Sequence, residues 1–226
     1  HPMFKSPPQM LGDASTAQSA SLSSLYDLLV TLSDAIGFIL LMIEYNLPEI
    51  IANISKSSQQ VVFQSTYEKL VTDQQVRSSW HDLVLAIIKR ESGRVDNLSR
   101  NLELRCPTFC NAAETKMYQG YEALQRAKKN EDEHTTKEAL RNSLNIFCEC
   151  INILTYGTLN NLCQDYKTFG FYEGAIELLL KAAQSFDLVP EKRNSILDLV
   201  IDTLRDAGVF ADGIQRMYLN ISILIL

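Results

Sequence analysis

Apolar side chains recur at α-helical spacing along most of this chain, and this periodicity is what most constrains the fold. In residues 25–36, leucine or isoleucine stands at the first, fourth, fifth, eighth and twelfth positions. Side chains at these positions lie on one face of a helix. Two further stripes consist of Trp80, Leu83, Val84, Ile87 and Ile88, and of Leu140, Leu144, Phe147, Cys148, Ile151 and Leu154. Because no alternating run of strand length stands out, the sequence predicts an all-α fold.

Start and stop signals divide the chain into roughly ten to eleven helices. The start signals are Pro48, Asp73, Asn111 with Glu114, and Pro190, and the stop signals are Gly93, Gly170 and Gly208. Proline suits the first turn of a helix, Asp and Asn suit the N-cap, and glycine suits the residue after the last turn. We expect helices over residues 95–104, 111–128, 158–169 and 171–186, with a charged loop at 130–134.

The arrangement of these helices is predicted to be an irregular α-solenoid of antiparallel helix pairs. Links between helices are short, which is typical of antiparallel neighbours in either a bundle or a solenoid. Segments 35–43, 178–180 and 199–201 are apolar on more than one face, so they are expected to pack on both sides, as stacked pairs do. The spacing Gly170-x-Tyr172-x-x-Ala175 resembles half a tetratricopeptide repeat, but no second copy follows at that period.

Residues 1–20 are interpreted as a flexible linker, and residues 21–226 as part of one solenoid domain. The first segment is rich in Pro and Ser and has no apolar period. The apolar run 35–43 is much shorter than the ~20 residues that cross a bilayer, so we expect a buried core helix there. Because the chain ends in the apolar run 221–226, we interpret it as a piece of a longer protein.

The composition and motifs predict no catalytic, metal or cofactor site. A net charge of −6 is opposite to the basic stripe typical of nucleic-acid binders, so we expect no direct nucleic-acid contact. Phosphate-binding, dinucleotide and zinc-protease motifs are absent from the sequence. Cys106 and Cys110 meet the pair spacing of a zinc site only loosely, and the five cysteines are expected to act as small apolar side chains. The three histidines are expected to be surface or packing residues.

One stretch, residues 163–183 with Phe171-Tyr172-Glu173-Gly174 at its centre, resembles the non-repetitive/WGA-negative nucleoporin family. Further similar segments are Arg105-Cys106-Pro107, residues 122–126, Arg141-x-Ser143-Leu144, residues 38–54 and residues 88–96. The similarity covers about residues 22–208 in the family's order. The chain departs from the family after Leu188, where a longer loop is usual and Pro190 here follows almost at once.

This resemblance implies a structural role in the inner ring of the nuclear pore complex. In that family a β-propeller precedes an α-solenoid, so the chain would come from the carboxy-terminal solenoid, with the propeller and its membrane-binding element absent. The partners implied are linker nucleoporins, including the unstructured linker region of a GLFG-repeat nucleoporin, and neighbouring inner-ring scaffold nucleoporins. The implied location is the nuclear pore complex at the nuclear envelope.

A dense aromatic cluster is the candidate partner-binding site. It consists of Tyr166, Phe169, Phe171 and Tyr172, near an expected turn between two helices. One hypothesis is that part of the cluster lines a groove for a partner, and the competing interpretation is that these rings pack in the solenoid core. Two other functions stay open at this stage: a helical-repeat adaptor or coat protein outside the pore, and an all-α enzyme fragment whose site lies elsewhere in its parent.

Overall fold

A computed structural model describes residues 10–90, 98–185 and 190–208, and the secondary structure in these ranges is helical without any strand. The helices preceding residue 91 are α1 Met10–Glu44, α2 Leu47–Ile51, α3 Lys56–Gln64, α4 Tyr67–Thr72 and α5 Gln74–Arg90. Those that follow are α6 Leu98–Arg105, α7 Ala112–Lys129, α8 Glu133–Glu149, α9 Tyr156–Thr168, α10 Tyr172–Ser185 and α11 Pro190–Asp206, with a short 3₁₀ turn, η1, at Ile151–Ile153. The all-α prediction is confirmed.

Side-chain caps explain where several helices begin. The Asp73 carboxylate accepts hydrogen bonds from the backbone N–H groups of Gln75 at 2.8 Å and Val76 at 3.4 Å, so it caps α5 as predicted. Thr155 accepts from the Thr158 N–H at 3.2 Å and caps α9. These side chains satisfy N–H groups that the first helical turn leaves without a backbone acceptor.

Most predicted boundaries agree with the structure. Pro48 lies in the first turn of α2, and α11 begins at Pro190. Gly170 and Gly208 have φ of +67° and +68° after α9 and α11, the left-handed conformation that stops a helix. Gly93 and the segment 187–189, where a longer family loop was expected, lie outside the described residues.

Three boundaries differ from the sequence prediction. Helix α1 begins at Met10, so residues 10–20 are helical although they were interpreted as linker. Three Ser or Thr hydroxyls in α1 donate to the carbonyl four residues earlier, which keeps these polar side chains compatible with a helix. The expected loop 130–134 ends early, because Asp132 caps α8 through the Thr135 N–H at 2.9 Å. Helix α9 begins two residues before 158, at the Thr155 cap.

The chain divides into two compact units, one of residues 1–86 and 100–111 and the other of residues 87–99 and 112–226. In the first unit Phe38 is fully buried, with its ring stacked on Phe109 at 4.3 Å and edge-on to Trp80 at 5.9 Å. The Asp34 carboxylate accepts hydrogen bonds from both the N–H and the hydroxyl of Thr108, at 2.7 and 2.6 Å. These contacts fix the second half of α1 in the core of this unit.

Helix α1 is long and apolar enough, over Thr16–Glu44, to cross a membrane by length and composition alone. Its most apolar window has a mean hydropathy of 1.8, and 28% of that window is buried. Long core helices of water-soluble proteins meet the same criterion. The burial of Ala35, Phe38, Leu41 and Met42 agrees with the core helix expected at residues 35–43. The expectation that this segment packs on both sides is wrong, because Ile36, Leu40 and Ile43 are exposed on the other side.

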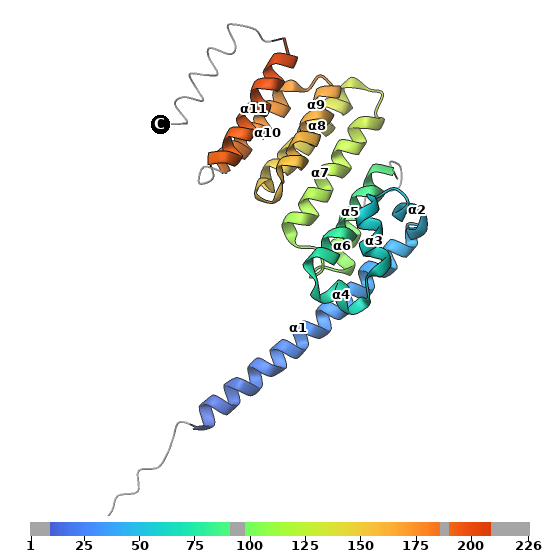
Figure 1. Cartoon of the computed structure of the whole chain (residues 1–226), viewed down its shortest axis with the longest axis vertical. Helices are drawn as coiled ribbons and strands as arrows, with labels where there is room; N and C mark the ends of the chain where they lie inside the picture. Colours follow the sequence, from blue (N-terminus) through green and yellow to red (C-terminus); the bar gives the residue numbers. More distant parts are fainter. Residues whose placement is uncertain (1–9, 91–97, 186–189, 209–226) are drawn as a thin grey trace, which may run out of the picture. The chain divides into compact units, whose positions relative to one another are not determined.

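In the second unit, helices α7 to α11 lie side by side (Figure 1). Ion pairs show their directions. Lys116 near the start of α7 pairs with Glu149 at the end of α8, so these two helices are antiparallel. Lys128 near the end of α7 pairs with Asp165 near the end of α9, at 2.7 Å, so every second helix runs the same way. This is the packing of antiparallel helix pairs predicted from the short links.

Candidate functional site

Tyr166, the first residue of the aromatic cluster, belongs to the core of the second unit. Its ring is fully buried, and its hydroxyl lies 3.1 Å from the Ser143 Oγ, which donates to the Gly120 carbonyl at 3.0 Å. The three residues come from α9, α8 and α7, so one hydrogen-bonded chain joins three helices. Burial raises the pKa of the Tyr166 hydroxyl well above its usual range, which keeps the group neutral.

Phe171 closes the turn between α9 and α10 and packs inward. Its ring meets Tyr166 edge-on with centroids 5.5 Å apart, and its backbone N–H donates to the Tyr166 carbonyl at 3.0 Å. A Cβ at position 174 would overlap the Phe171 ring, so only glycine fits there. This contact explains why the sequence block around residues 171–174 places a small residue three positions after an aromatic one.

Phe169 and Tyr172 are both half-buried, on either side of the same turn. The structure therefore brings all four predicted residues to one end of the α9–α10 pair. Only Tyr166 is buried, and the half-buried ring of Phe171 contacts it. Tyr172, as the first residue of α10, stands one turn before Ile176 and two turns before Leu180 on the same side of the helix.

A shallow depression of about 420 Å³ lies along the outer side of α10. We call it the α10 face; it is lined by Glu173, Ile176, Glu177, Leu180, Lys181 and Gln184. Ile176 and Leu180 are half-buried, whereas Ala175, Leu178, Leu179 and Ala182 on the opposite side of α10 are fully buried. Sequence reasoning missed this face, although the four-residue spacing of Tyr172, Ile176 and Leu180 is a visible signal for it.

A second depression, of about 430 Å³, separates η1 and the start of α9 from the start of α11. Its lining residues are Asn152, Ile153, Leu154, Thr155, Tyr156, Lys192, Ser195 and Ile196. Tyr156 is 49% exposed and Ile153 is 37% exposed, so two large apolar side chains border solvent here. None of these residues was predicted as a site residue, because η1 interrupts the helical period that sequence analysis follows.

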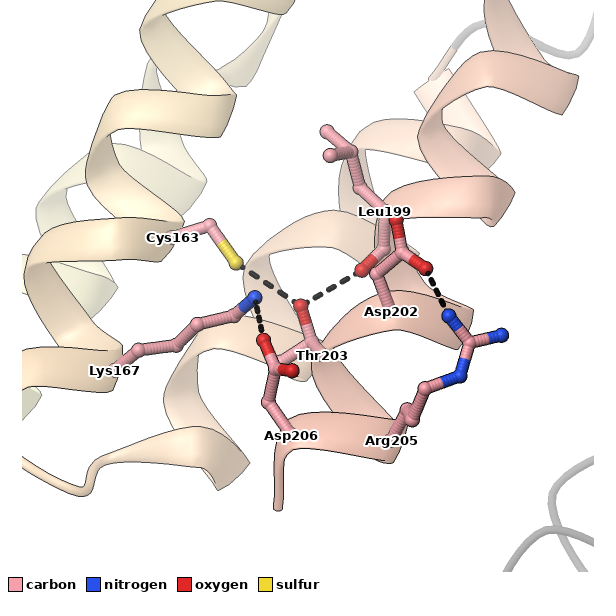
Figure 2. A network of polar contacts seen from close by, with 7 residues as sticks. All are labelled: Cys163, Lys167, Leu199, Asp202, Thr203, Arg205 and Asp206. Carbon is pink, nitrogen blue, oxygen red and sulfur yellow. Dashed lines mark hydrogen bonds and ion pairs between the residues drawn. The ribbon is translucent and has the colours of Figure 1, made fainter. Parts of the chain in front are cut away.

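Helices α9 and α11 are joined by a network of polar contacts (Figure 2). The Cys163 thiol lies 3.2 Å from the Thr203 hydroxyl, which donates to the Leu199 carbonyl at 2.7 Å. Lys167 pairs with Asp206 at 2.7 Å. Cys163 and Thr203 are buried, and neither has a histidine or carboxylate partner in the network that could act as a base. The arrangement holds two helices together and activates no nucleophile.

The part of the chain that the structure describes contains no assembled metal-binding site and no reactive thiol at Cys106 or Cys150. No group of three or more His, Cys, Asp or Glu side chains is placed there to hold a metal ion. None of the five cysteines forms a disulfide, and four of them are buried. Burial raises the pKa of Cys106 to about 12 and that of Cys150 to about 11, which makes both poor nucleophiles.

The fold and surfaces together define a class of protein: a stack of helices with apolar depressions on its outer surface. The sequence model described as "Non-repetitive/WGA-negative nucleoporin C-terminal" matches residues 3–206. The chain therefore belongs to this nucleoporin family, and it is a component of the nuclear pore complex. The resemblance seen in the sequence is confirmed, and the family favours the pore over an adaptor or coat protein elsewhere.

Two curated relatives are similar over most of the chain. Nucleoporin NUP170 of Chaetomium thermophilum is 29% identical over 180 residues, which are 77% of this chain and 13% of that protein. The probable nucleoporin C890.06 of Schizosaccharomyces pombe is 24% identical over 192 residues, or 82% of this chain and 14% of that protein. The chain thus spans about one seventh of the length of these relatives.

A solved structure supports the fold. The crystal structure of Chaetomium thermophilum Nup170 SOL matches 94% of this chain and 32% of its own, with a TM-score of 0.75 at 24% sequence identity. That structure is a helical solenoid, so the predicted α-solenoid is confirmed.

Proposed function

We propose that this chain is a structural, non-catalytic segment of an inner-ring scaffold nucleoporin. In this proposal the chain comes from the carboxy-terminal solenoid of a longer protein whose β-propeller precedes it and supplies any membrane contact. The single observation that supports it best is the match of the nucleoporin family over residues 3–206. The stacked helices of the second unit suit such a role because they are held by ion pairs and buried hydrogen bonds and carry no assembled reaction centre among the described residues.

The partners we propose are linker nucleoporins, including the unstructured linker region of a GLFG-repeat nucleoporin, and neighbouring inner-ring scaffold nucleoporins. Preformed apolar depressions between and along helices suit short segments that fold on binding. Ordering such a segment costs roughly 2–5 kcal/mol of the gross interaction energy, so each contact is expected to be weak. Several weak contacts on one assembly strengthen each other through high effective concentration.

The test is calorimetric titration of the purified chain with overlapping synthetic peptides that span the unstructured region of a GLFG-repeat nucleoporin. We expect saturable binding of at least one peptide and none of a scrambled peptide of the same composition. If no peptide binds while the chain keeps its helical circular dichroism spectrum, the proposed partner class is wrong.

A further inference from the structure

We propose that the α10 face is the docking site for a partner segment in which basic residues flank an apolar anchor. This inference rests on the proposed function and adds to it the location of the site and the chemistry of its occupant.

The two sides of α10 differ in how their apolar residues are buried. One side is committed to the core through fully buried residues such as Leu178 and Leu179, so the helix does not depend on its outer side to pack. On the outer side, Ile176 and Leu180 form the floor of the 420 Å³ depression, and Tyr172 continues their line by one turn. A row of half-buried apolar side chains at this spacing matches the anchors of a segment lying along a helix.

The negative charges on the α10 face favour a bound segment that carries basic residues. Glu173 and Glu177 are exposed and one helical turn apart, a like-charge spacing that weakens a helix. Neither carboxylate makes an ion pair or hydrogen bond with any residue in the described ranges. Other acids of the same unit are paired: Glu149 with Lys116, Asp165 with Lys128, and Asp206 with Lys167. Glu173 gains from the positive end of the helix dipole, but Glu177, in the middle of the helix, does not.

The far end of the α10 face carries a positive charge, Lys181, which determines the orientation of the bound segment along the helix. Lys181 lies one turn beyond Glu177, and its charge reaches Glu149 and the half-buried thiol of Cys148 at the end of α8. A bound segment is therefore expected to place its basic residues toward the start of α10 and any acidic residue toward Lys181. The second depression, bordered by Tyr156 and Ile153, has no acidic residue in its lining and therefore offers no comparable attraction for basic residues.

The experiment compares two variants with the same change in net charge, using the overlapping GLFG-repeat nucleoporin peptides as probes. The first is Glu173→Lys with Glu177→Lys. The matched control is Glu68→Lys with Glu103→Lys, at exposed positions of the first unit. We expect the first variant to lower peptide affinity about ten-fold, the effect of two rim charge pairs, and the control to change it less than two-fold. A peptide whose Lys and Arg are replaced by Glu should bind the first variant better than it binds the unchanged chain.

A second pair of variants tests the apolar floor without altering charge. Ile176→Ala with Leu180→Ala should weaken binding about ten-fold, whereas Tyr156→Ala in the second depression should leave it unchanged. Helical circular dichroism of each variant confirms that it folds, and sedimentation of the chain alone detects self-association.

Four outcomes overturn the α10 site. Equal binding by Glu173→Lys/Glu177→Lys and the unchanged chain excludes the site but leaves the proposed function standing. Equal losses in both charge variants mean non-specific attraction only. A dimer of the chain that Leu180→Ala disrupts makes a second copy the occupant. Absence of any peptide binding to the unchanged chain rejects the proposed function, and the site with it.

Discussion

Buried polar side chains connect helices within each unit. The Glu122 carboxylate of α7 is 5% exposed and accepts hydrogen bonds from the N–H and the hydroxyl of Ser99, both at 2.8 Å. Ser99 stands in the first turn of α6, where backbone N–H groups have no helical acceptor. Glu122 therefore caps a helix other than its own. Burying such a charge is tolerable only because it is hydrogen-bonded, so the geometry of each such contact is strongly specified.

Replacing Glu122 by alanine tests this buried cap. Glu122→Ala leaves the Ser99 N–H and hydroxyl buried without their acceptor, so we expect the free energy of unfolding to fall by about 2–3 kcal/mol. Urea unfolding followed by circular dichroism measures the change. Glu131→Ala, at an exposed position, is the control and should stay within about 0.5 kcal/mol of the unchanged chain. A loss in Glu122→Ala no larger than in this control would show that the cap contributes nothing.

Buried thiol and phenol groups predict how stability depends on alkaline pH. Burial raises the pKa of Cys106 from 9.0 to about 12 and that of Tyr121 from 10.0 to about 12. The unfolded chain then loses these protons at lower pH than the folded chain. Their contribution to stability is complete below pH 9 and decreases as pH rises from 9 toward 12. The urea midpoint should fall steadily between pH 9 and 11, and Cys106→Ala should reduce the slope. A midpoint that is independent of pH over this range contradicts the prediction.

At the scale of helices, local chemistry was the most predictable feature. The sequence correctly predicted helix starts at Pro48, Asp73 and Pro190 and a helix stop at Gly170. These residues act on the backbone through a few neighbouring residues only, so their effect can be predicted locally. The start of α1 could not be predicted in this way. Its first turns lack an apolar period, yet residues of middling helix propensity continue a helix that packing stabilises farther along.

Gly170 allows a direct test of a helix end. Its φ of +67° suits glycine, and nothing would obstruct a Cβ there, so the cost of a substitution is conformational alone. We expect Gly170→Ala to destabilise the chain by about 1 kcal/mol and Gly170→Asn by less, since asparagine tolerates this conformation better. Thermal or urea unfolding ranks the three chains. Equal stability of Gly170→Ala and the unchanged chain would show that this turn is not left-handed in solution.

The candidate site was only partly predictable, for a reason at the same scale. The sequence identified the aromatic residues at the α9–α10 turn, but not that Tyr166 is buried while Phe169, Phe171 and Tyr172 are half-buried. That depends on Ser143 from α8, which holds the Tyr166 hydroxyl, and on the missing Cβ of Gly174, which admits the Phe171 ring. Such contacts join residues that are distant in sequence or depend on the angle between two helices, and no local pattern encodes either.

At the scale of the whole molecule, the stacked helices of the second unit suit the proposed scaffold role in the nuclear pore. In the second unit, α7 is buried on all sides over residues 120–125, whereas α10 packs through one side, with Leu178 and Leu179, and keeps Ile176 and Leu180 half-buried on the other. The ion pairs between alternate helices, such as Lys167 with Asp206, lie at their ends and leave the outer sides open. The buried contacts therefore hold the helices of this unit together, and the outer side of α10 is proposed to bind the partner.

The most direct test of this account is the amount of the GLFG-repeat linker nucleoporin at the nuclear rim of living cells. Glu173→Lys with Glu177→Lys would be introduced into the whole scaffold nucleoporin that contains this chain, and rim fluorescence of the tagged linker nucleoporin measured. The account predicts a clear loss of rim signal, with the scaffold protein itself retained, and no loss for Glu68→Lys with Glu103→Lys. Undiminished rim signal in the first variant would contradict it.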